Sequence, residues 1–143
     1  MGIEKSSLKI VKEISAHLDL FTHYDRISFF GISMGWVVIR HAIKSLPQIH
    51  NKLHAFITFA TPHLGVEMSR SGLVRIGMWL LSVVDSNPGE KTAIHQLRLV
   101  DRDKKRDTLM YKLSQFGSIG KFKYVLLLGS DQDTYCNVDS AFI

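Results

Sequence analysis

Ser33 is the residue of this sequence whose surroundings point most directly to chemistry. It stands in G-I-S-M-G, a motif that directly follows residues 26–30, which are rich in β-branched and aromatic residues, and that leads into a longer apolar run. A serine in G-x-S-x-G between a strand and a helix is typically exposed as a nucleophile at the edge of a sheet. The sharp turn strains the serine backbone, and we expect Gly31 and Gly35, which lack a Cβ, to leave room for it. The N–H of Met34 at the helix start would stabilise an oxyanion beside the Ser33 hydroxyl.

Because five residues match G-x-S-x-G by chance in many turns, the flanking elements must support the motif. Three runs rich in β-branched and aromatic residues predict buried strands, over residues 26–30, 53–60 and 123–128. Apolar periodicity predicts helices over residues 4–20, 34–44, 71–84, 92–100 and 107–116, with Thr92 and Asp107 as N-caps and the charged run 101–107 as a solvated connection. The alternation predicts an α/β fold, with a parallel sheet, right-handed crossovers and helices on both faces.

Each predicted strand is followed by residues that could take part in a reaction. Ser33 follows the first, His63 in T-P-H-L-G follows the second, and Asp131 and Asp133 follow the third. Ligands of parallel sheets bind at the carboxyl ends of the strands. A nucleophile, a histidine and a carboxylate are therefore expected at one edge of the sheet.

The same segments resemble the α/β-hydrolase superfamily and, more narrowly, the putative serine esterase, lipase-like family of eukaryotes. The resemblance is carried by R-I-S-F-F-G-I-S-M-G-W-V-V-I-R, by N-K-L-H-A-F-I-T-F-A-T-P-H-L-G, and by Y-V-L-L-L-G-S-D-Q-D-T-Y with D-S-A-F-I after it. It implies that residues 1–143 form a single partial α/β-hydrolase domain with a helical cap insertion. It also implies a serine esterase with a Ser-Asp-His triad in that chain order, which acts on lipid or acyl-ester substrates in lipid metabolism.

The resemblance assigns roles to individual positions. Ser33 matches the nucleophile, the Met34 N–H matches one arm of the oxyanion hole, and Asp133 matches the acid that orients the histidine. Asp131 is the alternative acid, two residues away. His63 matches a residue near the substrate pocket that is not the triad base. Ile32 departs from the family, which usually has histidine before the nucleophile.

Two expected parts of the machinery are not found in the sequence. No histidine follows Asp133, because the last one is His95, and no upstream strand with an H-G turn precedes the first predicted helix. We expect the triad histidine beyond Ile143 and the missing strands before the first residue. Whether the chain is itself an enzyme stays open. The alternatives are a fragment of a longer hydrolase and a catalytically incomplete interaction module.

Composition narrows the remaining possibilities. The net charge of +5 comes from dispersed basic residues without a nucleic-acid motif, so no nucleic-acid partner is expected. No histidine or cysteine pair has metal-ligand spacing, and no metal or cofactor is predicted. The single Cys136 is compatible with a reducing compartment. The sequence shows no signal peptide or membrane span, which predicts a cytoplasmic protein. Gly2 fits a loose N-myristoylation pattern, so transient contact with a membrane surface stays an alternative, and the oligomeric state stays open.

Overall fold

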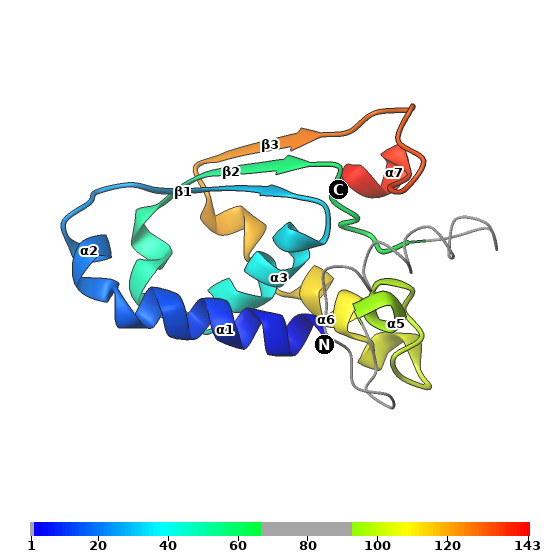
Figure 1. Ribbon diagram of the computed structural model, residues 1–143, viewed down its shortest axis with the longest axis horizontal. Coiled ribbons are helices and arrows are strands. Elements are labelled where there is room, and N and C mark those ends of the chain that lie inside the picture. The colour runs from blue at the N-terminus through cyan, green and yellow to red at the C-terminus, as the bar shows by residue number, and fades with distance from the viewer. Residues whose placement is uncertain (1, 67–92) are drawn as a thin grey trace.

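The protein is built on a three-stranded parallel sheet. The computed structural model describes residues 2–66 and 93–143 (Figure 1). Its strands β1 (Ile27–Ile32), β2 (Leu53–Phe59) and β3 (Tyr124–Leu128) lie in the order β1-β2-β3. Phe29 pairs with Phe56, and Phe56 in turn pairs with Val125. This arrangement confirms the predicted partial α/β fold and its parallel sheet.

Helices precede or follow every strand. The described α-helices are α1 (Ile3–Ala16), α2 (Leu18–Thr22), α3 (Met34–Ile43), α5 (Ala93–Leu97), α6 (Leu109–Gln115) and α7 (Val138–Ala141), with 3-10 turns at Pro47–Lys52, Lys105–Asp107 and Ile119–Lys121. None of the helices in residues 2–66 and 93–143 could cross a lipid bilayer, because each is too short or too polar. The predicted helix over 71–84, with its possible role as a cap, and the predicted N-cap Thr92 fall outside the described residues.

The prediction of one continuous helix over residues 4–20 was wrong. Residues 4–20 do not form one helix, because α1 ends at Ala16 and its C-cap, His17, has φ of −119° and ψ of 25°. The ring Nδ1 of His17 contacts the carbonyl oxygen of Glu13 at 2.9 Å. A side chain that bonds to a carbonyl one turn back competes with the helical hydrogen bonds there.

The N-cap predicted at Asp107 was also wrong. Thr108 occupies the N-cap position of α6, and the N–H of Leu109 donates instead to Asp101 Oδ2 at 3.1 Å. Asp101 is buried, so the run 101–107 is not entirely solvated. The reason is that the first N–H groups of a helix need acceptors, and a carboxylate that folds back from the preceding loop supplies one.

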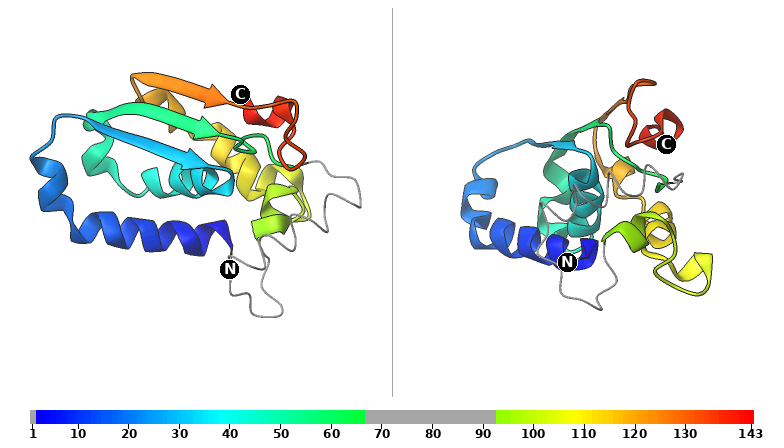
Figure 2. Two further views of the ribbon diagram at one scale, coloured as in Figure 1. Left: turned by 45° about the horizontal axis from the view of Figure 1, so that its top comes forward. Right: turned by 45° about the vertical axis from the view of Figure 1, so that its right-hand side comes forward.

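The helices of the described residues cover one face of the sheet and leave the other open. Figures 1 and 2 show the described helices that pack on the sheet lying on a single face. On the opposite face Phe30 is 63% exposed and Leu126 is 46% exposed. The expectation that the third strand is buried was therefore wrong, because β3 is an outer strand of the described sheet. Helices were predicted on both faces of the sheet, but in the described ranges they lie on one face.

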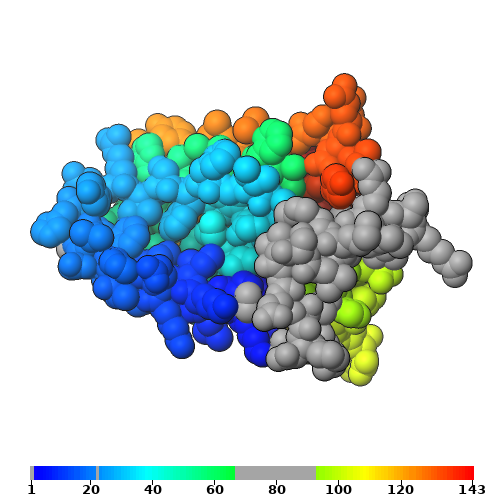
Figure 3. Space-filling view, viewed as in Figure 1, coloured from blue at the N-terminus to red at the C-terminus, as the bar shows by residue number. Residues whose placement is uncertain are grey.

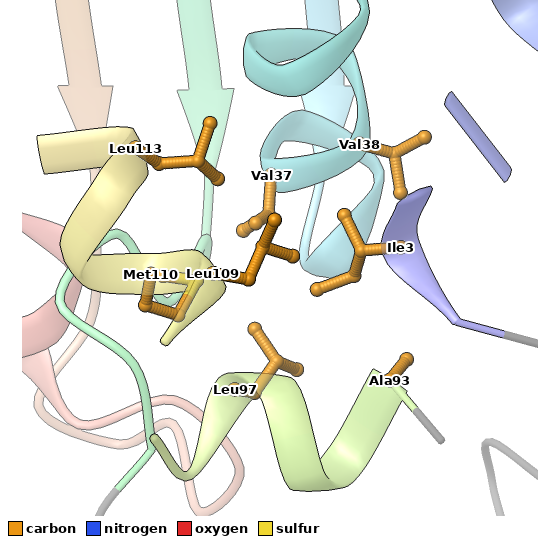
Figure 4. Close-up of a cluster of buried hydrophobic side chains, with 8 residues drawn as sticks. All are labelled: Ile3, Val37, Val38, Ala93, Leu97, Leu109, Met110 and Leu113. Atoms are coloured by element: carbon orange, nitrogen blue, oxygen red, sulfur yellow. The ribbon is translucent and has the colours of Figure 1, made fainter. Parts of the chain in front are cut away.

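Helix α3 joins the two parts of the hydrophobic core. Its Val37 and Val38 pack with residues of α1, α5 and α6 in one cluster, whose side chains converge in Figure 4. Its Trp36 and Ile43 belong to a second cluster beneath the sheet, together with Phe56. A helix that is apolar on nearly every face is thus buried from two sides, as its sequence predicts.

Trp36 requires the glycine at the start of G-x-S-x-G. Its indole lies 4.0 Å from the ring of Phe56, centroid to centroid, and its N–H donates to the carbonyl oxygen of Ile57. A Cβ at Gly31 would lie 2.5 Å from Cδ1 of that indole. Among the residues that the structure describes, a Cβ at Gly35 would meet nothing within 4 Å. The expectation that the second glycine makes room was therefore wrong, since no described atom lies near its side-chain position.

The two glycines make a matched pair for a stability test. We expect Gly31→Ala to lower the free energy of unfolding by about 1–3 kcal/mol, because the indole must move from a packed position. Gly35→Ala is expected to leave it unchanged or raise it by up to about 1 kcal/mol, since alanine is the better helix former. Urea unfolding followed by circular dichroism measures both, and equal losses would contradict the steric role of Trp36.

Candidate active site

Ser33 occupies a strained turn between β1 and α3. Its φ is 54° and its ψ is −137°, a conformation that costs a residue other than glycine about 1–3 kcal/mol. The turn is held by the Ser33 N–H, which donates to the carbonyl oxygen of Phe59 at 2.9 Å. Met34 is the first residue of α3, so its N–H has no acceptor within the helix. The serine hydroxyl and a free N–H therefore lie next to each other at the end of β1.

The other predicted residues follow β2 and β3 at the same edge of the sheet. All three arrows in Figure 1 point the same way, and the Ala60 N–H bonds to the carbonyl oxygen of Leu128 at 2.8 Å, just beyond the strands. Because β2 lies between the outer strands, the segments that carry Ser33 and Asp133 leave the sheet about two strand spacings, or roughly 10 Å, apart. Within residues 2–66 and 93–143, no hydrogen bond joins a histidine to either side chain.

Asp133 holds its own loop in shape. Its Oδ1 accepts the N–H of Tyr135 at 2.7 Å and that of Cys136 at 3.1 Å, which is the pattern of an Asx turn. Burial, together with the charge of Asp133, raises the pKa of the Cys136 thiol to about 11. The thiol is therefore neutral at physiological pH and is no competing nucleophile. Asp131, the alternative acid, is exposed.

His63 is buried beneath the sheet, with both ring nitrogens engaged. It is 3% exposed, its Nδ1 lies 3.4 Å from Arg40 Nη1, and its Nε2 lies 3.2 Å from Thr58 Oγ1. A guanidinium can only donate, so Nδ1 accepts and the ring proton is assigned to Nε2. Burial and the charge of Arg40 lower the pKa of His63 to about 3. In this arrangement the ring is neutral and offers no lone pair to Ser33.

Arg40 contacts the predicted pocket residue His63, and sequence reasoning missed it. It lies on α3, is 4% exposed, and donates to the carbonyl oxygens of His63 and Leu113 at 3.4 and 3.3 Å. Together with His63 it lines a pocket of about 340 Å³ on the helical side of β3. The available signal was a single cation in the otherwise apolar run M-G-W-V-V-I-R, where a solvated arginine is not expected.

The T-P-H-L-G loop is held by the C-terminal segment and by α5. The carbonyl oxygen of Ser140 accepts the His63 N–H at 2.8 Å, and the Ser140 hydroxyl donates to the carbonyl oxygen of Gly65. Figure 3 shows this segment, orange to red, against the end of β2. Gly65 has φ of 93°, and a Cβ there would lie 2.5 Å from the Leu97 carbonyl oxygen. The loop can therefore approach α5 only with glycine at this position.

A second pocket of about 530 Å³ opens beside this loop. Its lining includes Leu64 and Leu99 together with Arg98, Lys105 and Asp139. The pocket combines apolar walls with charged groups, and neither Ser33 nor Asp133 lines it. In the part of the chain that the structure describes, no three His, Cys, Asp or Glu side chains gather as a metal site would need.

Comparison with known families supports the motif-based resemblance. A family model described as putative serine esterase matches residues 1–143, which is the whole sequence. No solved structure matched the chain. The family match confirms the relationship predicted from the three motifs, while the roles of Ser33, Met34, Asp133 and His63 stay predictions.

The buried state of His63 predicts a dependence of stability on pH. The unfolded chain binds a proton at His63 near pH 6.5, whereas the folded chain does so only near pH 3. Protons therefore favour unfolding between these values, and the His63 contribution decreases by about 2 kcal/mol from pH 7 to pH 5. Urea unfolding at the two pH values should show this loss in the wild type and not in His63→Gln. His41, whose pKa is also lowered by burial, titrates in both proteins, and identical losses would contradict the prediction.

Proposed function

We propose that this chain, which belongs to the putative serine esterase family, hydrolyses carboxylic esters with Ser33 as the nucleophile. The observation that carries the proposal is the backbone of Ser33, with φ of 54° at the carboxyl end of β1 and directly before α3. Strain of this kind persists where the surrounding structure enforces it, and it is concentrated at functional sites. Here it presents a hydroxyl beside an N–H that has no acceptor within α3.

The reaction would proceed by acyl transfer. Ser33 Oγ attacks the ester carbonyl, and the negative charge that develops on the carbonyl oxygen is stabilised by the Met34 N–H. The hydroxyl proton passes to a base and then to the leaving alcohol. Water hydrolyses the acyl-enzyme and releases the acid. The family resemblance assigns the base to a histidine that follows the acid, with Asp133 as its orienting partner.

The substrates we propose are acyl esters with an apolar acid, as in lipids. The pocket of about 530 Å³ beside the T-P-H-L-G loop has leucine walls, the cations Arg98 and Lys105, and the acid Asp139. Such a lining suits an acyl chain attached to a negatively charged or polar group. We also propose that the protein acts in lipid metabolism and is located in the cytoplasm. The free, buried thiol of Cys136 is compatible with this location.

A second candidate function is that of a catalytically incomplete interaction module. The observation that favours it is the engagement of both His63 ring nitrogens, with no described histidine bonded to Ser33 or Asp133. A serine without a base keeps its proton, and catalysis is reduced by orders of magnitude, roughly 10⁴-fold or more. The two functions differ in whether Ser33 can be acylated.

Ester turnover tests the nucleophile directly. With imidazole added as a base, the 143-residue chain is expected to hydrolyse p-nitrophenyl butyrate, and Ser33→Ala is expected to lower the rate at least about a hundredfold because no acyl-enzyme can form. Added imidazole, which can take the serine proton, should raise the rate only where Ser33 is present. Ser114→Ala, an exposed serine on α6, is the matched control. Equal rates for wild type and Ser33→Ala, with no fluorophosphonate label on Ser33, would support the interaction module instead.

A pair of substitutions distinguishes the two candidate acids. Asp133→Asn keeps an oxygen that can accept the N–H groups of Tyr135 and Cys136, so the loop is expected to survive while the charge is lost. Where a histidine serves as the base, we expect Asp133→Asn to lower kcat about a thousandfold or more, and Asp131→Asn to leave it within about twofold of the wild type. Rates with p-nitrophenyl butyrate measure both. The reverse order of effects would assign the acid to Asp131.

A further inference from the structure

The guanidinium of Arg40 is buried, and no acid among the described residues compensates its charge. Of the residues that the structure describes, none supplies a carboxylate in an ion pair with it. Its hydrogen bonds go to neutral acceptors, namely His63 Nδ1 and the carbonyl oxygens of His63 and Leu113, at 3.3 to 3.4 Å. These bonds are longer than the usual 2.7–3.2 Å, and Nε has no partner. An almost fully buried charge is thus only weakly satisfied.

The Arg40 side chain remains charged in spite of its burial. Burial lowers the pKa of Arg40 to about 10, so the group is protonated at neutral pH. His63 beside it is neutral and cannot offset the charge. A buried charge is costly to leave unpaired, and interiors normally pair it. An anion that enters from outside would supply what the described residues do not.

The pocket next to Arg40 has the size and lining for an amphiphilic ligand. Its volume of about 340 Å³ falls at the lower end of the range of small-molecule sites, roughly 300–1,000 Å³. Its walls include Phe116, Ile119, Val125 and Leu127, from the end of α6, the following 3-10 turn and β3. Neither Ser33 nor Asp133 lines it, so it is separate from the proposed catalytic residues.

We propose that this pocket binds the carboxylate of a small apolar acid, with the carboxylate on Arg40 and the hydrocarbon part against Phe116, Ile119 and Leu127. A carboxylate matches the planar donors of a guanidinium, and its single charge equals that of the one cation in the lining. A phosphate dianion would leave a second charge uncompensated among apolar walls. The inference does not depend on hydrolysis at Ser33.

Calorimetric titration with sodium octanoate tests the proposal at neutral pH. The 143-residue chain carrying Ser33→Ala is used, so that binding is measured apart from turnover. We expect one saturable site for octanoate, with 1-octanol and inorganic phosphate at least about tenfold weaker, because a charge-assisted pair contributes about 1.5–3 kcal/mol. Failure to bind octanoate at millimolar concentration, or equal binding of 1-octanol, would overturn the proposal.

Three further variants locate the site. Arg40→Gln should weaken octanoate at least about tenfold, whereas Lys44→Gln should leave it within about twofold, since Lys44 is an exposed cation, with Nζ 5.3 Å from the centroid of the Phe116 ring, and does not line the pocket. Val125→Trp should abolish binding by filling the pocket while the guanidinium stays intact, which keeps the test valid if Arg40→Gln fails to fold. Circular dichroism monitors folding. Unchanged binding in Val125→Trp, or an effect of Lys44→Gln equal to that of Arg40→Gln, would place the anion elsewhere.

Discussion

The packing of the Trp36 indole against the sheet is the contact on which the rest of the structure depends. The ring lies over β1 and β2, donates its N–H to a β2 carbonyl, and packs edge-on against Phe29 and Phe122. This contact fixes the distance between α3 and the sheet. Because Ser33 lies between β1 and the helix that carries Trp36, the same contact enforces the strained turn at the serine. The first glycine of the motif is thus explained by packing as much as by chemistry.

Helix α3 carries groups for two separate purposes. Its first turn presents the Met34 N–H at the edge of the sheet, and Arg40, almost two turns later, lies buried beneath it. Arg40 is linked through His63 to the loop that follows β2 and through Leu113 to α6. One apolar helix therefore positions both the proposed nucleophile and the buried cation, and the hydrophobic clusters on its two sides hold it in place.

Two motifs that lie far apart in the sequence support each other in the fold. The loop 61–65 is held by Ser140, which bonds to the backbone of His63 and of Gly65. Asn137 in turn caps α7 by accepting the N–H of Asp139 at 3.0 Å. Ser140, in the D-S-A-F-I segment, thus holds the loop that carries His63 beneath the sheet.

The sequence by itself determined the three strands to within one or two residues, the parallel order that their alternation with helices requires, and the turn at Ser33. These follow from local periodicity and from glycine placement, which neighbouring residues specify. Only the tertiary structure decided that Asp101 caps α6, that β3 is exposed, and that Arg40 lies against His63. Each of these features depends on contacts between residues that are distant in the chain. Whether a charge is buried or a strand is exposed depends on which elements pack over it. Local sequence patterns do not encode that packing.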